Sequence, residues 1–109
     1  MKQYYIVSTK HTSKGDTALT LWGPNNAGYF WEKSMAGVYS EEEIKSFKGD
    51  NDNVPIDKEA ADKLFLPAKD FGDSYIGLPN DTTVRTILGL SDKNMKPAKY
   101  AGCRMKFHL

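Results

Sequence analysis

The chain of 109 residues has little of the side-chain chemistry on which many small proteins depend. It contains one cysteine, Cys103, and two histidines, His11 and His108. A lone cysteine excludes an internal disulfide, and so few soft ligands argue against a structural zinc site within one chain. We therefore expect no metal and no cofactor, and a reducing cytoplasm as the compartment.

Long apolar runs are also missing. No run approaches the roughly 20 residues that a membrane-spanning helix needs. The first segment, MKQYYIVSTKH, lacks the roughly 7–15 apolar residues of a secretory signal, so we expect the first strand there instead. Hydrophobic residues make up 39% of the chain and charged residues 27%, which are ordinary globular values. The sequence predicts one α+β domain over residues 1–109, with no membrane partner.

Motifs of common enzyme classes are absent from the sequence. It contains no G-x-S-x-G, no G-x-x-x-x-G-K-[ST], no H-E-x-x-H and no C-x-x-C. The best catalytic candidates are His11 and Asp16, because a histidine oriented by a carboxylate is a usable general base. Ser, Gly and Asp are also ordinary turn residues, and a loop histidine is usually solvated. A small enzyme that uses this loop remains one alternative.

The formal net charge of +1 hides a segregation of charge along the chain. Residues 40–81 hold eleven acids and five lysines, whereas residues 93–109 hold five basic residues and no acid. Segregated charge creates a local field even when the total is near zero. The acidic middle argues against a protein that coats nucleic acid. The basic tail, with Arg104 and Lys106, leaves a small phosphate contact open.

Aromatic residues gather in TLWGPNNAGYFW, residues 20–31. β-Branched and aromatic residues predict strands at 3–9, 17–22 and 29–32, with the glycine- and asparagine-containing loop joining the last two. Pairing across this loop places Trp22 opposite Tyr29. Alternation along the strands then divides the hairpin into two faces. One face carries Trp22, Tyr29 and Trp31, and the other carries Leu19, Leu21 and Phe30.

The first helix has the clearest local signal. Ser40 and Glu43 match a capping box, in which each side chain binds the other residue's backbone amide. The helix is expected to end at Gly49 and to turn Ile44 and Phe47 inward. The acidic run at its start could be taken for a metal or acid–base site, but capping explains it. We interpret the following GDNDN, residues 49–53, as a polar turn, because its spacing fails the calcium-loop pattern.

Two further helices are predicted. Asp57 can cap a helix over residues 58–65 that packs through Ala61, Leu64 and Phe65. A third helix begins after Asn80 or Asp81 and ends near Gly89. Its apolar positions are Val84, Ile87 and Leu88.

The C-terminal segment alternates between apolar and polar residues. Cys103, Met105, Phe107 and Leu109 fall on one side, which predicts a half-buried strand, and a short strand is expected at 74–76. With strands at both ends and helices between, the fold class is α+β. We expect a mainly antiparallel sheet of about four to five strands, with two to three short helices packed on one face.

The segments YYIVSTKHT, LTLWGPNNAGYFW and AGVYSEEEI, all within residues 4–44, resemble short phage and prophage accessory proteins of unassigned function. The resemblance implies a bacterial host cytoplasm and a role in phage–host conflict or takeover. It transfers no activity and no site residue to this chain, and it does not extend to the basic tail.

Three functions follow from these observations. The first is a non-enzymatic accessory protein that binds and inhibits a host or anti-phage defence protein, since Trp and Tyr are enriched in interface hot spots. The second is a nucleotide or nucleic-acid binding module, since exposed aromatics stack bases. The third is the small enzyme described above. The alternative for the hairpin aromatics is that they pack in the core. The candidate binding residues are Trp22, Asn25, Asn26, Tyr29 and Trp31, with His11, Asp16, Arg104 and Lys106 as secondary candidates.

Overall fold

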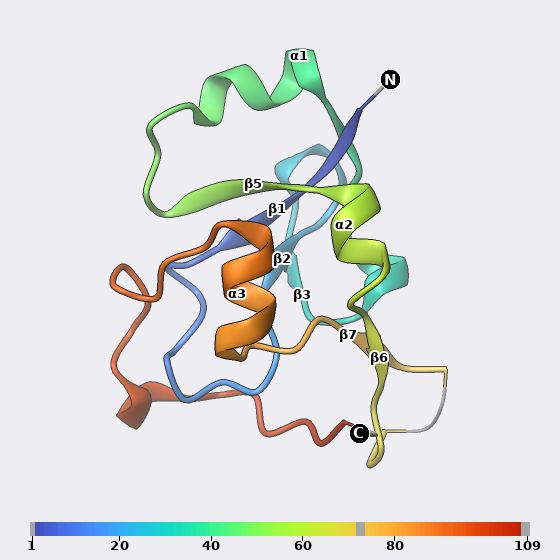
Figure 1. The fold of residues 1–109 in the computed structure, drawn as a ribbon, viewed down its shortest axis with the longest axis vertical. Coiled ribbons are helices and arrows are strands. Elements are labelled where there is room, and N and C mark those ends of the chain that lie inside the picture. The colour runs from blue at the N-terminus through green and yellow to red at the C-terminus, as the bar shows by residue number, and fades with distance from the viewer. Residues whose placement is uncertain (1, 72–73, 108–109) are drawn as a thin grey trace.

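The computed structural model of the chain describes residues 2–71 and 74–107. Its main sheet has five antiparallel strands, and β1 (Gln3–Ser8) is the central strand (Figure 1). Tyr4 pairs with β4 on one side and β5 on the other, and Val7 pairs with β2 and β5. Strand β5 therefore runs along one edge of β1, while β4 and the β2–β3 hairpin share the other edge. The other strands are β2 (Leu21–Trp22), β3 (Tyr29–Phe30), β4 (Tyr39–Ser40) and β5 (Asn53–Asp57).

A second, smaller sheet pairs β6 (Leu66–Pro67) with β7 (Ile76–Gly77). Isolated bridges connect it to the rest of the chain: Gly77 pairs with Glu32, and Ala68 pairs with Phe107. With the main sheet, it confirms the mainly antiparallel α+β fold.

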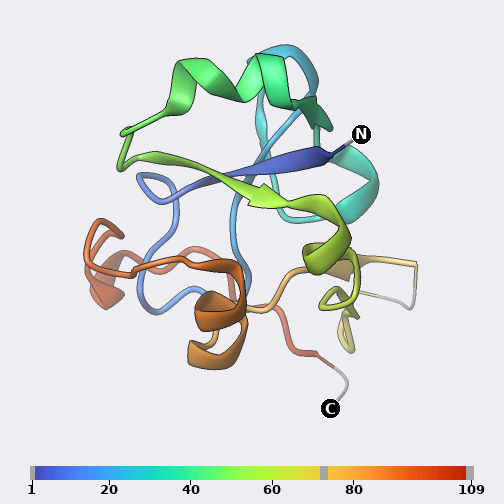
Figure 2. The ribbon, with the colours of Figure 1, turned by 45° about the horizontal axis from the view of Figure 1, so that its top comes forward.

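The main core lies on the face of the sheet that carries Tyr5 and Val7. Helices α2 (Lys58–Asp62) and α3 (Thr82–Leu88) cover this face. Helix α1 (Glu41–Ile44) and the 3-10 turn η3 (Lys45–Phe47) lie on the opposite side of β1 and β5 (Figure 2). The buried core residues are Tyr5, Val7, Leu19, Leu21, Ile56, Ala61, Leu78, Val84 and Met95.

The predicted N-terminal caps and the end of the third helix are confirmed, whereas α1 ends at Ile44 instead of Gly49 and α2 ends at Asp62 instead of residue 65. The Ser40 hydroxyl accepts from the Glu43 amide, and the Glu43 carboxylate accepts from the Ser40 amide. Asp57 and Asp81 cap α2 and α3, and Gly89 ends α3 in the left-handed conformation, with φ of 72°. These features depend on residues within one turn of each other, which is why the sequence specifies them. Shorter 3-10 turns are η1 (Pro24–Asn26), η2 (Lys33–Met35) and η4 (Ala98–Tyr100).

Several predicted packing positions are wrong. Ile44 and Phe47 are only half-buried and lie outside the main core, because α1 stops after one turn and crosses the other side of the sheet. Ile87 is 55% exposed, because the short helix α3 buries only Val84 fully. Strand β5 was not predicted, since Asn53, Pro55 and Asp57 interrupt its apolar pattern.

The strand predicted over residues 17–22 is shorter than expected. Only Leu21 and Trp22 join the sheet, while the preceding residues bond to other segments: Thr17 to Cys103 and Leu19 to Leu78. The strand expected at 74–76 is found at Ile76–Gly77.

The predicted C-terminal strand is also wrong, although its alternating burial is real. Cys103 and Met105 are buried, but residues 101–106 form no strand, and only Phe107 makes a bridge. One apolar side of the segment packs against a second cluster, containing Ala18 and Ala68, without a ladder of backbone hydrogen bonds. The predicted positions His108 and Leu109 lie outside the described residues.

Within residues 2–71 and 74–107, the helices are all too short or too polar to cross a lipid bilayer.

Candidate functional site

The loop of the β2–β3 hairpin is held in a specific shape. Asn25 and Asn26 have positive φ values of 56° and 59°, and Gly28 has φ of 82°, conformations that Asn and Gly adopt more easily than other residues. The Tyr39 hydroxyl accepts from the Asn26 amide at 2.9 Å and donates to the Gly23 carbonyl at 2.5 Å. The hairpin loop is therefore held by the Tyr39 side chain as well as by its own turn conformation.

The hairpin and the loop after β1 bring three aromatic rings together on the face of the sheet opposite the main core. The register pairs Trp22 with Tyr29, as predicted, and their ring centroids lie 4.4 Å apart. The imidazole of His11 stacks on the Tyr29 ring, with ring centroids 3.8 Å apart and ring planes inclined by 27°. We call His11, Trp22 and Tyr29 the aromatic cluster. Tyr29 is 41% exposed, so the cluster is open to solvent.

Polar contacts fix both ends of the aromatic cluster. The Trp22 indole Nε1 donates to Asn53 Oδ1 at 2.6 Å, and Asn53 Nδ2 donates to Asp50 at 3.1 Å. At the other end, His11 Nδ1 shares a hydrogen bond of 2.9 Å with the Ser8 hydroxyl. Because the rings are already ordered, a partner that contacts them would lose little further side-chain entropy on binding.

The electrostatic setting of the cluster is mixed. Burial of the imidazole, and then the positive charges of Lys96 and Lys10, lower the pKa of His11 below its ordinary value of 6.5. His11 is therefore neutral at neutral pH. The Trp22 end lies beside Asp50, whose pKa is lowered by hydrogen bonds from Asn53 and Asp52. The cluster thus has cations near one end and a carboxylate near the other.

Trp31 does not belong to the aromatic cluster. Strand β3 ends at Phe30, and Trp31 turns its indole Nε1 to the Thr20 hydroxyl at 3.0 Å. Its ring packs against the second cluster, which includes Cys103 and Met105. The predicted tryptophan face is therefore divided. Both tryptophans are half-buried, but Trp31 packs against the C-terminal segment, whereas Trp22 packs against the exposed Tyr29.

His11 and Asp16 are not brought together. The Asp16 carboxylate accepts from the backbone amides of Ser13, Gly102 and Cys103, at 2.8, 2.7 and 2.8 Å. Asp16 is only 5% exposed, so this carboxylate ties the loop to the C-terminal segment. His11 instead contacts Ser8 and Tyr29. Among residues 2–71 and 74–107, no carboxylate is bonded to the imidazole, so the geometry predicted for a general base at His11 and Asp16 is not formed.

The other secondary candidates lie on the C-terminal segment. Arg104 and Lys106 are exposed, but their segment joins residues 68–70 rather than the hairpin: Lys106 bonds through its backbone to Lys69 and Asp70. The pairing that would have set these cations beside the hairpin strands is not formed.

Comparison with known proteins adds no identification. No protein-family model, no curated protein and no solved structure matches the chain. Candidate functions therefore rest on the side-chain geometry. Among the described residues, no group of three or more His, Cys, Asp or Glu side chains is placed to hold a metal ion.

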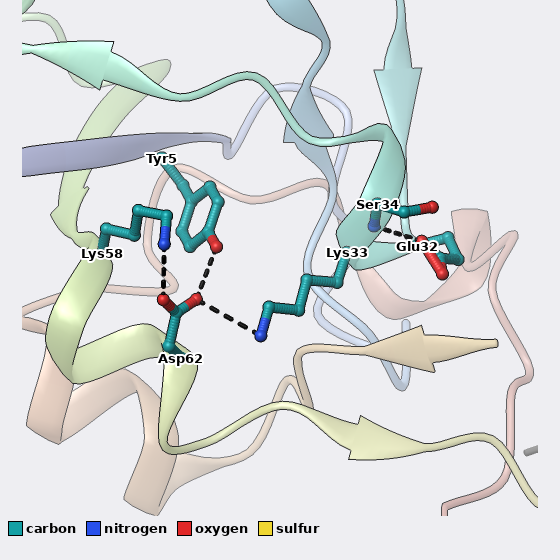
Figure 3. A network of polar contacts seen from close by, with 6 residues as sticks. All are labelled: Tyr5, Glu32, Lys33, Ser34, Lys58 and Asp62. Atoms are coloured by element: carbon teal, nitrogen blue, oxygen red, sulfur yellow. Dashed lines mark hydrogen bonds and ion pairs between the residues drawn. The ribbon is translucent and has the colours of Figure 1, made fainter. Parts of the chain in front are cut away.

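A second polar network, which the sequence did not indicate, surrounds Asp62 (Figure 3). The Asp62 carboxylate accepts from the Tyr5 hydroxyl at 2.5 Å and from Lys58 at 2.7 Å, and Lys33 lies 3.6 Å away. Burial, followed by the bond to Asp62, raises the pKa of Tyr5, so its hydroxyl stays protonated and donates. The network joins α2 to β1 and to the turn η2. Glu32 caps this turn, because its carboxylate accepts from the Ser34 amide. We assign it a structural role.

Proposed function

We propose that this chain is a non-enzymatic binding protein whose aromatic cluster contacts a protein partner. The observation that supports this most directly is the pre-ordered stack of His11, Tyr29 and Trp22, in which His11 and Tyr29 are exposed. Rigid Trp and Tyr side chains give large contact areas at low entropy cost and are enriched in interface hot spots. The resemblance of residues 4–44 to phage accessory proteins gives the proposal its setting, a host or defence protein in the bacterial cytoplasm.

Nucleotide binding is the competing function, since Lys10 and Lys96 lie near His11. Base stacking requires a free ring face. His11 already occupies a face of Tyr29, and Trp22 tilts against the same ring at 46°. The exposed parts of the cluster are therefore better suited to contact the varied groups of a protein surface than to stack on a base.

Retention of a bacterial protein on the immobilised chain tests the proposal. We expect the wild type to retain one host protein stoichiometrically, and Tyr29→Ala to weaken the purified complex by about 2 kcal/mol, or roughly thirtyfold in Kd. Tyr100→Ala is the matched control, because Tyr100 is 60% exposed and lies on η4, outside the cluster. Equal binding by wild type and Tyr29→Ala would contradict the proposal.

Tryptophan emission tests the competing function with the same protein. Under our proposal, nucleotides and single-stranded oligonucleotides leave the emission of wild-type protein unchanged. Quenching that weakens with added salt and disappears in Tyr29→Ala would instead support nucleic-acid binding at the cluster.

A further inference from the structure

Exposed lysines gather at one corner of the molecule, beside the aromatic cluster. The fold places the loop of residues 9–16 alongside residues 95–101 (Figure 1). The Lys14 amide donates to the Lys96 carbonyl at 2.8 Å, and the Lys96 amide donates to the Thr12 carbonyl at 2.9 Å. The Ser13 hydroxyl donates to the carbonyl of Pro97, 84 residues further along the chain, at 2.8 Å. We call the exposed lysines of these two segments, Lys10, Lys14, Lys96 and Lys99, the basic corner.

The lysines of the basic corner stand on a fixed backbone. A Cβ atom at Gly15 would lie 3.0 Å from the Ala98 carbonyl oxygen, so the two segments are in close contact. The Asp16 carboxylate binds the amides of Gly102 and Cys103 and ties the segments together a second time. The points from which the four side chains project are therefore set by the fold.

The charge of the basic corner is not neutralised locally. Within residues 2–71 and 74–107, none of its four lysines forms an ion pair. Lys99 instead lies over the exposed Tyr100 ring, with 5.1 Å from Nζ to the ring centroid. Residues 10–17 and 92–104 together hold six Lys and Arg residues and two acids. One of the acids, Asp16, is only 5% exposed, and its carboxylate binds three backbone amides.

The opposite charge collects elsewhere on the molecule. Residues 41–62 hold eight acids and three lysines and form α1, η3, β5 and α2. Helix α1 lies at the top of Figure 1, whereas η4 is the orange-red coil at the lower left. The segregation of charge along the sequence is thus kept in space. An approaching anionic group is attracted to the basic corner and repelled by the α1 end.

The basic corner adjoins the aromatic cluster at His11. Lys10 precedes His11 in the chain, and the Lys96 amide bonds to the next residue, Thr12. Burial of the imidazole lowers the pKa of His11, and the charges of Lys96 and Lys10 lower it further because both cations lie near the ring. A partner that contacts Tyr29 therefore also meets these two lysines.

We propose that the basic corner binds an acidic segment of the partner polypeptide, next to the group that contacts the aromatic cluster. The proposal rests on the proposed function, because it names the chemistry of the same partner. Lysine ammonium groups are point charges on flexible stems, so they can follow the carboxylates of an Asp- or Glu-rich segment without a single fixed geometry. Such charges at the rim of an interface mainly raise the association rate and its salt dependence.

A nucleic-acid strand fits the basic corner less well. Its phosphates recur at every nucleotide, so an extended strand needs a continuous basic track. Here the positive area is bounded by acids. The Thr9 amide donates to the carbonyl of Asp52, the exposed Asp92 precedes Lys93, and Asp50 lies beyond Trp22 at the far end of the aromatic cluster. A short acidic segment carries its charge only where the lysines are.

Short peptides test this specificity by amide NMR shifts of the labelled full chain. We expect a capped peptide of four glutamates to shift the amides within residues 10–15 and 95–101 in a saturable manner, and added salt to weaken its binding. A capped peptide of four glutamines is the neutral comparison and should bind about fivefold more weakly or worse. Equal binding of the two peptides, or no saturable shifts in these residues, overturns the proposal.

Matched pairs of lysine variants separate the basic corner from the net charge. Lys14→Gln combined with Lys96→Gln should weaken the glutamate peptide about three- to tenfold. The fold should persist, because the bonds between the two segments use backbone atoms of these residues. Lys63→Gln combined with Lys69→Gln removes the same charge from exposed positions elsewhere and should leave the binding unchanged. Equal weakening by both pairs would overturn the proposal.

Two further measurements address other occupants. A thymidine pentanucleotide has four phosphodiester groups and should bind no more tightly than the glutamate peptide. Tighter binding of the oligonucleotide at the same amides would assign the basic corner to nucleic acid and overturn the proposal. Salt-sensitive self-association in sedimentation that the Lys14 and Lys96 variant pair removes would assign it to the acidic end of a second copy, and would also overturn it.

The same samples distinguish this proposal from the proposed function. Tyr29→Ala should still bind the glutamate peptide, because Tyr29 is not part of the basic corner. If the peptide fails while Tyr29-dependent retention of a host protein persists, only the basic-corner proposal is wrong. If the peptide binds through Lys14 and Lys96 but retention does not depend on Tyr29, only the proposed function is wrong.

Discussion

At the scale of single residues, Asp16 shows how a chemically suggestive side chain serves the fold. Its carboxylate accepts from three backbone amides: that of Ser13, three residues away, and those of Gly102 and Cys103, which lie 86 and 87 residues away along the chain. A hydrogen bond to a charged group contributes about 1.5–3 kcal/mol, and unpaired buried amides are costly. Asp16 therefore holds residues 13 and 102–103 in place instead of orienting a catalytic histidine.

Replacing Asp16 should accordingly lower the free energy of unfolding. We expect Asp16→Ala to destabilise the protein by about 3 kcal/mol in urea unfolding, and Asp16→Asn by less, because the amide oxygen keeps one acceptor. Asp92→Ala, at an exposed position, is the control and should change stability by under about 0.5 kcal/mol. If Asp16→Ala leaves the free energy of unfolding nearly unchanged, the three amides must find other partners in the variant.

His11 should make stability dependent on pH. Its pKa is lowered in the folded state by burial and by Lys96 and Lys10. The unfolded chain therefore binds more protons than the folded one below about pH 6.5, and stability should fall as the pH drops through that value. Between pH 8 and pH 5, the melting temperature should decrease less for His11→Gln than for the wild type. Parallel curves for the two proteins would refute this.

Residue types alone indicated part of the candidate site. The turn chemistry of Gly23, Asn25, Asn26 and Gly28 predicts the hairpin and the pairing of Trp22 with Tyr29. The stacking of His11 on Tyr29 was not predictable, because these residues are far apart in sequence and no periodic pattern relates them. Likewise, no sequence pattern indicates that β3 ends before Trp31 or that Trp31 packs against the C-terminal segment.

At the scale of elements, the helix starts and the end of α3 could be predicted, while the ends of α1 and α2 and several strands could not. Capping boxes and left-handed glycines act within one turn, so the sequence specifies them locally. Strand β5 has Pro55 in its centre, which removes a backbone donor and hides the strand in the sequence pattern. The C-terminal segment has the alternation of a strand but packs without a neighbouring ladder. Alternating burial and strand pairing are separate properties.

Gly89 gives a prediction for the end of α3. Its φ of 72° is unfavourable for other residues, while a Cβ atom there would meet nothing within 4 Å. Gly89→Ala should therefore lower the free energy of unfolding by about 1 kcal/mol, from backbone strain alone. Gly102→Ala is the matched control, since that site is also open and is not left-handed. Equal free energies of unfolding for the two variants would argue against backbone strain at position 89.

At the scale of the whole molecule, the two sides of the sheet differ in what packs on them. One side carries Tyr5 and Val7 under α2 and α3 and forms the main core. The other side buries Ile6 but carries the aromatic cluster and, between β1, β5 and the α1–η3 segment, a hollow whose apolar lining residues are half-buried. An open apolar surface of this kind is typical of an interaction site. We therefore attribute stability mainly to the first side and propose that the second side binds a partner.

Radical footprinting inside bacteria tests this assignment most directly. The chain, expressed from a single gene copy, is oxidised in intact cells and again after purification, and modification of Tyr29 is compared with that of Tyr100. Both are exposed in the isolated protein, at 41% and 60%. We predict that Tyr29 is several-fold less modified in cells than in the purified protein, while Tyr100 is unchanged. Equal modification of Tyr29 in both samples would contradict the assignment of this surface to a partner.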